Sequence, residues 1–188
     1  LDADDLMHEN TGEQNYNESA YYNFYDPAVQ LGGFVRIGNR PNEGYAEMTC
    51  CLYLPDGRVG FMFARPRIPD NTKFDAGGMR FVVKTPMRAH DVRYEGNLCV
   101  MARPLDLLDP KAAFTSNPHV PAVVELAYTA VSPVSGGEPR EEKDGQWVSV
   151  KSEKTGQEFA KGHLEQHMRA VGRVVVDGTE WQIDGYGL

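Results

Sequence analysis

The sequence has little cysteine and no long apolar run. Only three of its 188 residues are cysteines (Cys50, Cys51 and Cys99), and an odd number without regular spacing does not predict a disulfide framework. Cys50 and Cys51 lie in a strand pattern, so their side chains should point to opposite faces as buried, reduced thiols. No stretch approaches the ~18 apolar residues of a membrane-spanning helix. We therefore expect a cytoplasmic protein that does not span a membrane.

Positive charge is also scarce. The chain carries 19 lysine and arginine residues against 27 aspartate and glutamate residues, for a formal net charge of −8. A nucleic-acid-binding domain needs a basic face to displace counterions, and an anionic membrane surface attracts basic segments. The charge balance therefore argues against nucleic acid and membrane as partners.

Several common catalytic motifs are missing as well. The sequence contains no G-x-S-x-G, no P-loop, no G-x-G-x-x-G and no C-x-x-C. Serine-hydrolase, nucleotide-binding and dinucleotide-binding functions consequently have no support in the sequence. We expect neither a cofactor nor a bound metal.

Short strand patterns separated by turn residues are abundant. About ten segments have the alternation and the β-branched or aromatic content of strands, and most are joined by hairpin-type turns such as 55–57 and 177–178. Helical propensity is concentrated in 105–114, where Pro110 interrupts it. These features predict an all-β fold, an antiparallel lipocalin-like β-barrel or a strongly bent sandwich, with one short helical insertion.

Two segments lack apolar residues that could anchor them in a core. Residues 1–20 are polar and acidic, and we expect an arm with a short helix at Asp4–His8. Residues 133–157 are charged and glycine-rich, which predicts an exposed loop. The domain itself is predicted to span 21–188, with a separate strand at 97–104.

Two histidines near the end of the chain form a conspicuous polar cluster with a glutamate. In "GHLEQHMRAVGRVVVDGTEW", the spacing of His163, Glu165 and His167 fits neither helical zinc motif. In a strand the three side chains share one face at intervals of ~7 Å, too far apart to bind one metal without local bending. They are either a proton-transfer set facing a cavity or partner domain, or a polar face toward solvent. The dyad His90–Asp91 is interpreted as a surface feature.

The string "NESAYYNFYDP" places a carboxylate beside several phenols. Tyr21, Asn23 and Tyr25 share one face of a strand, near Glu18. In an apolar pocket Glu18 could protonate an alkene or a carbonyl, and the tyrosines could orient a ligand oxygen. The alternative is that the tyrosines cap the core with their hydroxyls in water.

The string "RIGNRPNEGYAEM" combines Arg36 and Arg40 with Glu43 and Glu47 around a turn. Structural ion pairs are the default interpretation. If Arg36 points into the barrel it requires a partner there, because an unpaired buried charge is costly, and Glu47 on the next strand is the natural candidate. Arg36 would then contribute to a ligand site.

Four strings together carry a resemblance to a known family: "NESAYYNFYDP", "LGGFVRIGNRPNEGYAEMTCCLYLPDGRV", "FDAGGMRF" and "GHLEQHMRAVGRVVVDGTEWQIDGYGL". They resemble the N-terminal domain of an uncharacterised bacterial family related to AttH-like and carotenoid 1,2-hydratase (hydroxyneurosporene synthase) proteins. Such proteins look like two lipocalin-like barrels in tandem. The resemblance implies that 21–188 is the first barrel and that a second follows Leu188. It also implies a cavity for a sizeable apolar ligand.

These observations lead to a functional hypothesis. We expect the barrel to bind an apolar small molecule of terpenoid or polyketide/polyphenol type, with cofactor-free hydratase, dehydratase or isomerase chemistry as one option. An acid among Glu18, Glu47 and Glu165 would protonate the ligand, while His163, His167 or a tyrosine orients water. The alternatives are a non-catalytic carrier or sensor and a structural domain with a filled barrel. The expected macromolecular partner is a second barrel domain or another copy of the chain.

Overall fold

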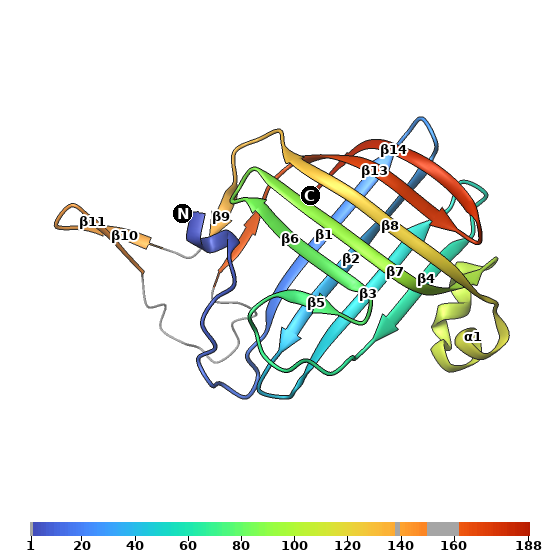
Figure 1. Ribbon diagram of the computed structural model, residues 1–188, viewed down its shortest axis with the longest axis horizontal. Helices are drawn as coiled ribbons and strands as arrows, with labels where there is room; N and C mark the ends of the chain where they lie inside the picture. The colour runs from blue at the N-terminus through green and yellow to red at the C-terminus, as the bar shows by residue number, and fades with distance from the viewer. Residues whose placement is uncertain (1, 138–139, 150–161) are drawn as a thin grey trace.

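A computed structural model of the chain describes residues 2–137, 140–149 and 162–188. Within these residues ten strands form one antiparallel sheet, in the order β4-β3-β2-β1-β14-β13-β8-β7-β6-β5. A further antiparallel pairing of β4 with β7 joins the sheet to itself, so that eight strands from β4 to β7 close into a ring (Figure 1). This arrangement confirms the expected antiparallel all-β class.

The ring strands are β1 (Glu18–Asp26), β2 (Leu31–Arg40), β3 (Tyr45–Tyr53), β4 (Val59–Ala64), β7 (Ala89–Met101), β8 (His119–Ala130), β13 (Met168–Val176) and β14 (Thr179–Gly187). The remaining elements are η1 (Asp2–Asp5), β5 (Phe74–Ala76), β6 (Met79–Thr85), η2 (Pro104–Leu108), α1 (Pro110–Ser116), β9 (Ser135–Gly137), β10 (Arg140–Lys143), β11 (Gln146–Ser149) and β12 (His163–Glu165).

The predicted hairpins are present and follow the turn chemistry of the sequence. β13 and β14 are joined by Asp177 and Gly178, which both have positive φ angles (50° and 76°), as a tight hairpin turn requires. Gly57, with φ of 85°, likewise serves the turn between β3 and β4. Each of these turns is local in sequence, so the residue types alone were sufficient to predict it.

β7 is longer than the sequence suggested. The prediction of a separate strand at 97–104 was wrong, because Ala89–Met101 is one continuous strand. Its ladder with β8 runs without interruption from Ala89 opposite Thr129 to Cys99 opposite His119. The first half of β7 also pairs with β6, and its last three residues pair with β4 to close the ring.

The helical insertion was predicted correctly, but Pro110 has a different role. Pro110 begins α1 rather than interrupting it, and the Asp109 side chain accepts a hydrogen bond from the Ala112 N–H at 3.1 Å. Proline suits the first turn because its missing N–H has no partner there. Ala113 and Phe114 pack with residues of β3, β4 and β7 in a small apolar cluster.

The interior of the ring is filled by its own side chains. Fully buried tyrosine, leucine, isoleucine and methionine residues occupy it, including Tyr94, Tyr128, Leu52 and Met48. Cys50 belongs to this main core, whereas Cys51 belongs to the small cluster around α1, so the two point to opposite faces as expected. All three cysteines are buried and free.

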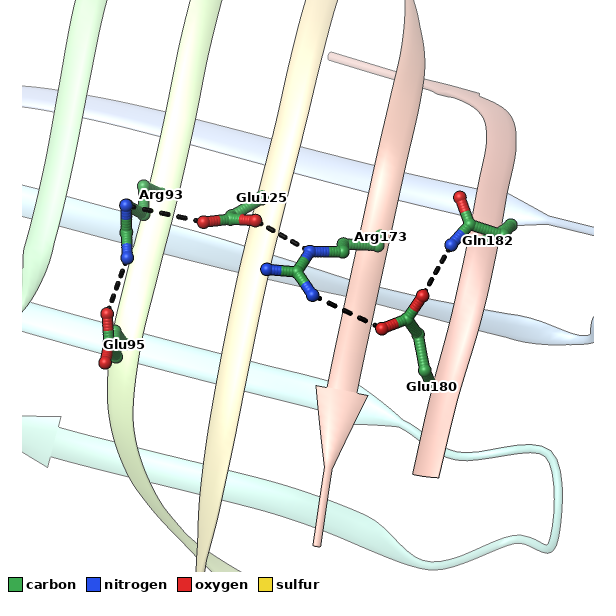
Figure 2. Close-up of polar contacts among 6 residues, drawn as sticks. All are labelled: Arg93, Glu95, Glu125, Arg173, Glu180 and Gln182. Atoms are coloured by element: carbon green, nitrogen blue, oxygen red, sulfur yellow. Dashed lines mark hydrogen bonds and ion pairs between the residues drawn. The ribbon is translucent and has the colours of Figure 1, made fainter. Parts of the chain in front are cut away.

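The outer surface of β7, β8, β13 and β14 carries a row of paired charges (Figure 2). Glu125 accepts from Arg173 at 2.7 Å and lies 3.4 Å from Arg93, which also pairs with Glu95. Arg173 reaches Glu180 at 3.3 Å. A shallow hollow of about 480 Å³ lies on this face. Exposed ion pairs of this kind contribute little stability individually, so we interpret the row as a water-facing surface.

The N-terminal arm and α1 lie at opposite ends of the ring (Figure 1). The predicted helix at Asp4–His8 is instead the short 3₁₀ turn η1, and β1 begins at Glu18, inside the segment assigned to the arm. Of the loop predicted at 133–157, the described parts form β9, β10 and β11, and the rest lies outside the described residues. No helix in the described ranges is long and apolar enough to cross a membrane.

Candidate functional site

The residues predicted to bind ligand lie mainly on the outside of the ring. In β1 the even-numbered residues Tyr22 and Phe24 are buried, while Tyr21 and Tyr25 are exposed. Tyr21 is opposite Arg36 of β2, so both face outward. The Asn23 side chain instead accepts a hydrogen bond from the Leu188 N–H at 2.8 Å, which ties β1 to the end of β14.

The charged residues around the β2–β3 turn form structural ion pairs, as the default interpretation predicted. Arg40 donates to Glu43 at 2.6 Å. Glu47 pairs with Arg65 of the β4–β5 segment at 2.8 Å, rather than with Arg36. The partner of Glu47 is therefore an arginine 18 residues further along the chain.

The two histidines near the end of the chain do not lie on one continuous strand. β12 ends at Glu165 and pairs with β9, whereas β13 begins at Met168 and pairs with β8 and β14. His163 and Glu165 contact each other at 3.1 Å with side chains 72% and 57% exposed, and His167 is also exposed. This cluster faces solvent, and the described residues contain no group of side chains able to hold a metal.

Glu18 is the predicted acid that lies at the inner face of the ring. It shares the inward face of β1 with Ala20 and Tyr22, and it is opposite Asn39, which is fully buried. The end of the ring marked by Glu18 and Asn39 lies beneath the N-terminal arm. We call this end the polar mouth, defined by Asp5, His8, Tyr16, Glu18, Tyr22, Asn39 and His90.

A buried chain of three polar side chains occupies one side of the polar mouth. The Asp5 carboxylate is 2.8 Å from His90 Nε2, and the Tyr22 hydroxyl is 2.9 Å from His90 Nδ1. Asp5 also accepts a hydrogen bond from the Met87 N–H at 2.5 Å. His90 is opposite Tyr128 of β8, whose ring packs 5.0 Å from that of Tyr22. The interpretation of His90 as a surface residue was wrong, because its side chain is only 6% exposed.

The electrostatics of this chain favour one proton arrangement. Burial raises the pKa of Asp5, but hydrogen bonds from His90 and Met87 outweigh it, so the net pKa lies below the usual range. Burial, with the nearby Asp5 charge, raises the pKa of Tyr22 well above its ordinary value. Tyr22 therefore keeps its proton and Asp5 stays ionised at neutral pH. An imidazole that carries its proton on Nε2 satisfies both neighbours.

A second carboxylate–histidine–tyrosine group lies on the other side of the polar mouth. Glu18 accepts a hydrogen bond from the Tyr16 hydroxyl at 2.8 Å and is 2.9 Å from His8 Nδ1. Burial first, and then the bond to Glu18, raises the pKa of Tyr16 above its ordinary range. Because Glu18 and Tyr22 are four residues apart on one strand face, the two groups are separated by roughly 13 Å.

Asn39 adds a polar group that is only partly satisfied. Its amide nitrogen donates to the Lys73 carbonyl at 2.9 Å and to Asn71 Oδ1 at 3.2 Å. Its Oδ1 atom is buried and has no hydrogen-bond partner among the described residues. A buried acceptor without a donor is energetically unfavourable, so Asn39 Oδ1 is an unsatisfied polar atom at this end of the ring.

Another buried carboxylate, Asp26, lies at the far end of β1 and has a structural role. It accepts hydrogen bonds from the backbone N–H groups of Ala28 and Asp184, both at 2.8 Å. These two bonds cap the β1–β2 turn and fasten β1 to β14. Asp26 is therefore satisfied by backbone and is not a candidate for proton transfer.

Sequence reasoning missed His90 and Asp5, although one signal was present. In "AHDVRY" His90 is in phase with Val92 and Tyr94, so strand alternation places it on the apolar, inward face. Asp5 gave no comparable signal, because its contact with His90 spans 85 residues. Only the path of the arm across the mouth brings the two together.

Comparisons with known proteins identify a family without a described activity. Neither the curated proteins nor the solved structures contain a significant match. A family model described as a domain of unknown function, DUF7064, matches residues 1–188. Since this match covers the whole sequence, the chain belongs to the DUF7064 family.

Proposed function

We propose that the polar mouth binds a small molecule with an apolar body and an oxygen-bearing head, of terpenoid or polyphenol type. The observation that carries this proposal is the convergence of two carboxylate–histidine–tyrosine groups at one inner end of the ring. Polar groups gathered beside an apolar surface are typical of small-molecule sites.

The surroundings of the polar mouth suit such a ligand. Phe81 packs edge-on against Tyr22 at 5.1 Å, Phe74 lies beside Phe81, and Ile37 is fully buried on β2, the strand paired with β1. These side chains offer an apolar floor, while the tyrosines and Asn39 offer hydrogen-bonding groups. Because the deeper interior is filled, the ligand would take the space that the N-terminal arm now occupies.

Proton transfer is the chemistry that the site supports. Tyr22 keeps its proton and is therefore a hydrogen-bond donor rather than a base; its hydroxyl donates to His90 Nδ1, and a ligand oxygen that reaches it would compete for that same proton. Once a ligand has displaced the arm and its Asp5 carboxylate, His90 Nε2 can exchange a proton with a neighbouring carbon or oxygen atom, while the Tyr22 hydroxyl still holds the ring through Nδ1. A cofactor-free hydratase, dehydratase or isomerase would need these elements, and Glu18 remains a candidate acid on the other side. The same site without turnover would serve a carrier or sensor.

A ligand panel with matched variants tests the proposal. Terpenoids and polyphenols would be screened by native mass spectrometry and then assayed for turnover with the wild type, His90→Gln and His163→Gln. We expect His90→Gln to lose turnover while retaining most binding, and the exposed control His163→Gln to behave as wild type. Binding that is unaffected by both His90→Gln and Tyr22→Phe would show that the ligand lies elsewhere.

A filled structural domain is the second candidate. It is favoured by the packed interior and by the position of two hollows outside it, one on the outer charged face and one beside the arm at Gly137 and Leu164. In this case no member of the panel binds, and the domain supports a second barrel or another copy of the chain. We also propose, with either candidate function, that the chain is a lipocalin-like relative of AttH-like and carotenoid hydratase proteins. Its three free cysteines favour a cytoplasmic location.

A further inference from the structure

The N-terminal arm, residues 2–17, contributes one partner to each polar group of the mouth. Asp5 of the arm contacts His90 of the ring, and His8 of the arm contacts Glu18 of the ring. The two contacts are therefore reciprocal, because the arm provides the carboxylate in one and the imidazole in the other. Breaking both would expose the inner face of β1 at this end.

Apolar burial does little to hold the arm in place. η1 contains no buried residue, and Leu6 is 48% exposed. Further contacts of the arm are polar, such as the Asn10–Asn42 amide pair and the bond from Asn71 to the His8 carbonyl. Hydrophobic burial is the main source of folding stability, so a segment held by polar contacts can open while the ring remains folded.

We propose that the arm is a displaceable lid, held by the Asp5–His90 and His8–Glu18 contacts, whose opening admits ligand to the polar mouth. This inference rests on the proposed function for its purpose, but the opening itself does not require a ligand. When the lid opens, His90 loses its carboxylate partner at the moment it becomes accessible. Access to the site and the surroundings of His90 therefore change together.

One backbone amide reports directly on the position of the lid. The Met87 N–H, in the turn between β6 and β7, donates to the Asp5 carboxylate. Its hydrogen exchange is protected only while Asp5 is in place. Leu126, in the middle of β8 and hydrogen-bonded within the sheet, serves as a reporter of global unfolding.

Hydrogen exchange measured by NMR on the full chain tests the lid. In the wild type we expect the Met87 amide to exchange at least tenfold faster than that of Leu126, because the lid opens without global unfolding. His8→Gln should accelerate Met87 exchange roughly three- to tenfold, although His8 does not contact Met87, since loss of one latch favours opening of the whole arm. Glu9→Gln removes an exposed charge from the same segment and should leave both rates unchanged.

Two results would overturn the lid. One is a Met87 amide that exchanges at the same rate as Leu126 in the wild type. The other is a Met87 amide that exchanges at the same rate in His8→Gln as in Glu9→Gln. That result would mean that the Asp5–His90 and His8–Glu18 contacts open independently. Failure of the proposed function is a separate outcome. If hydrogen exchange behaves as expected but no member of the ligand panel binds to Asp5→Ala, the lid is supported and the ligand site at the polar mouth is refuted.

Discussion

Replacing Tyr22 with phenylalanine probes the buried polar chain with a single-atom change. Tyr22→Phe removes the hydroxyl that lies 2.9 Å from His90 Nδ1. It keeps the ring that packs against Phe81 and Tyr128 at 5.1 and 5.0 Å. The substitution therefore tests the hydrogen bond with little change in packing.

The expected loss of stability comes from the polar atom that loses its hydrogen-bond partner. His90 Nδ1 would be buried without a partner, because the His90 side chain is only 6% exposed and no other bond to this atom is present in the described structure. Leaving a buried polar atom unsatisfied costs about 1–3 kcal/mol. For a chain of this size that corresponds to a fall in Tm of roughly 2–12 °C.

Urea and thermal unfolding, followed by circular dichroism, measure this cost. Tyr25→Phe is the matched control, since Tyr25 lies on the same strand with its side chain exposed on the opposite face. Its unfolding free energy should change by less than about 0.5 kcal/mol. A double-mutant cycle of Tyr22→Phe with Asp5→Ala should show a coupling of about 0.5–3 kcal/mol, because both residues act on the same imidazole.

Equal unfolding free energies for Tyr22→Phe and Tyr25→Phe would refute the stabilising role of the Tyr22–His90 hydrogen bond. That result would mean that water or a rearranged neighbour satisfies His90 at negligible cost. A coupling energy of zero in the cycle would show that Asp5, His90 and Tyr22 do not act as one chain. Equal stabilities of the two variants would also weaken the proposed site, in which the Tyr22 hydroxyl holds the imidazole of His90.

Three further predictions address charge, backbone and surface. The folded-state pKa of Asp5 is lowered, so its contribution to stability is present above its ordinary pKa of 3.8 and is lost as the pH falls through the folded value. In thermal melts at a series of pH values, the stability difference between wild type and Asp5→Ala should therefore be constant near neutrality and shrink below about pH 4. Gly78→Ala should destabilise the folded protein by more than about 1 kcal/mol, because Gly78 has φ of 86° and an added Cβ would meet the Glu95 carbonyl oxygen. Gly57→Ala is the control: Gly57 has a similar φ but open space around it, so this variant measures the cost of the backbone angle alone. Glu125→Gln, which breaks two exposed ion pairs, should lower Tm only slightly, and the difference should vanish in about 1 M salt, where the screening length is ~3 Å.

Local features of the chain were predictable because their causes are local. The hairpin at Asp177–Gly178 depends on residues that tolerate positive φ. A short helical insertion was expected from the helical propensity of 105–114, although the helix begins at Pro110, which was expected to interrupt it. The opposite orientations of Cys50 and Cys51 follow from strand alternation alone. Each of these statements requires only neighbouring residues.

Features that depend on distant partners were not predictable in the same way. The sequence pattern predicted a break before Asn97, but continuous pairing with β8 carries the strand to Cys99 and pairing with β4 carries it to Met101. The strand expected through His163 and His167 divides at 166–167, where the Gln166 side chain donates to the carbonyls of Met87 and Ser132. In both cases contacts between segments far apart in sequence override the local pattern.

The sequence by itself determined the antiparallel all-β class, the principal hairpins, the short helix and the burial of the cysteines, since alternation and turn chemistry act over a few residues. It also named Glu18, together with Glu47 and Glu165, as a candidate acid, and that role stays a prediction. Only the tertiary structure decided which face of β1 is inside, and so turned Tyr21 and Tyr25 outward. The same holds for the meeting of Asp5 with His90: closure of the ring and the path of the arm fix that contact, because no local pattern links residues 85 positions apart.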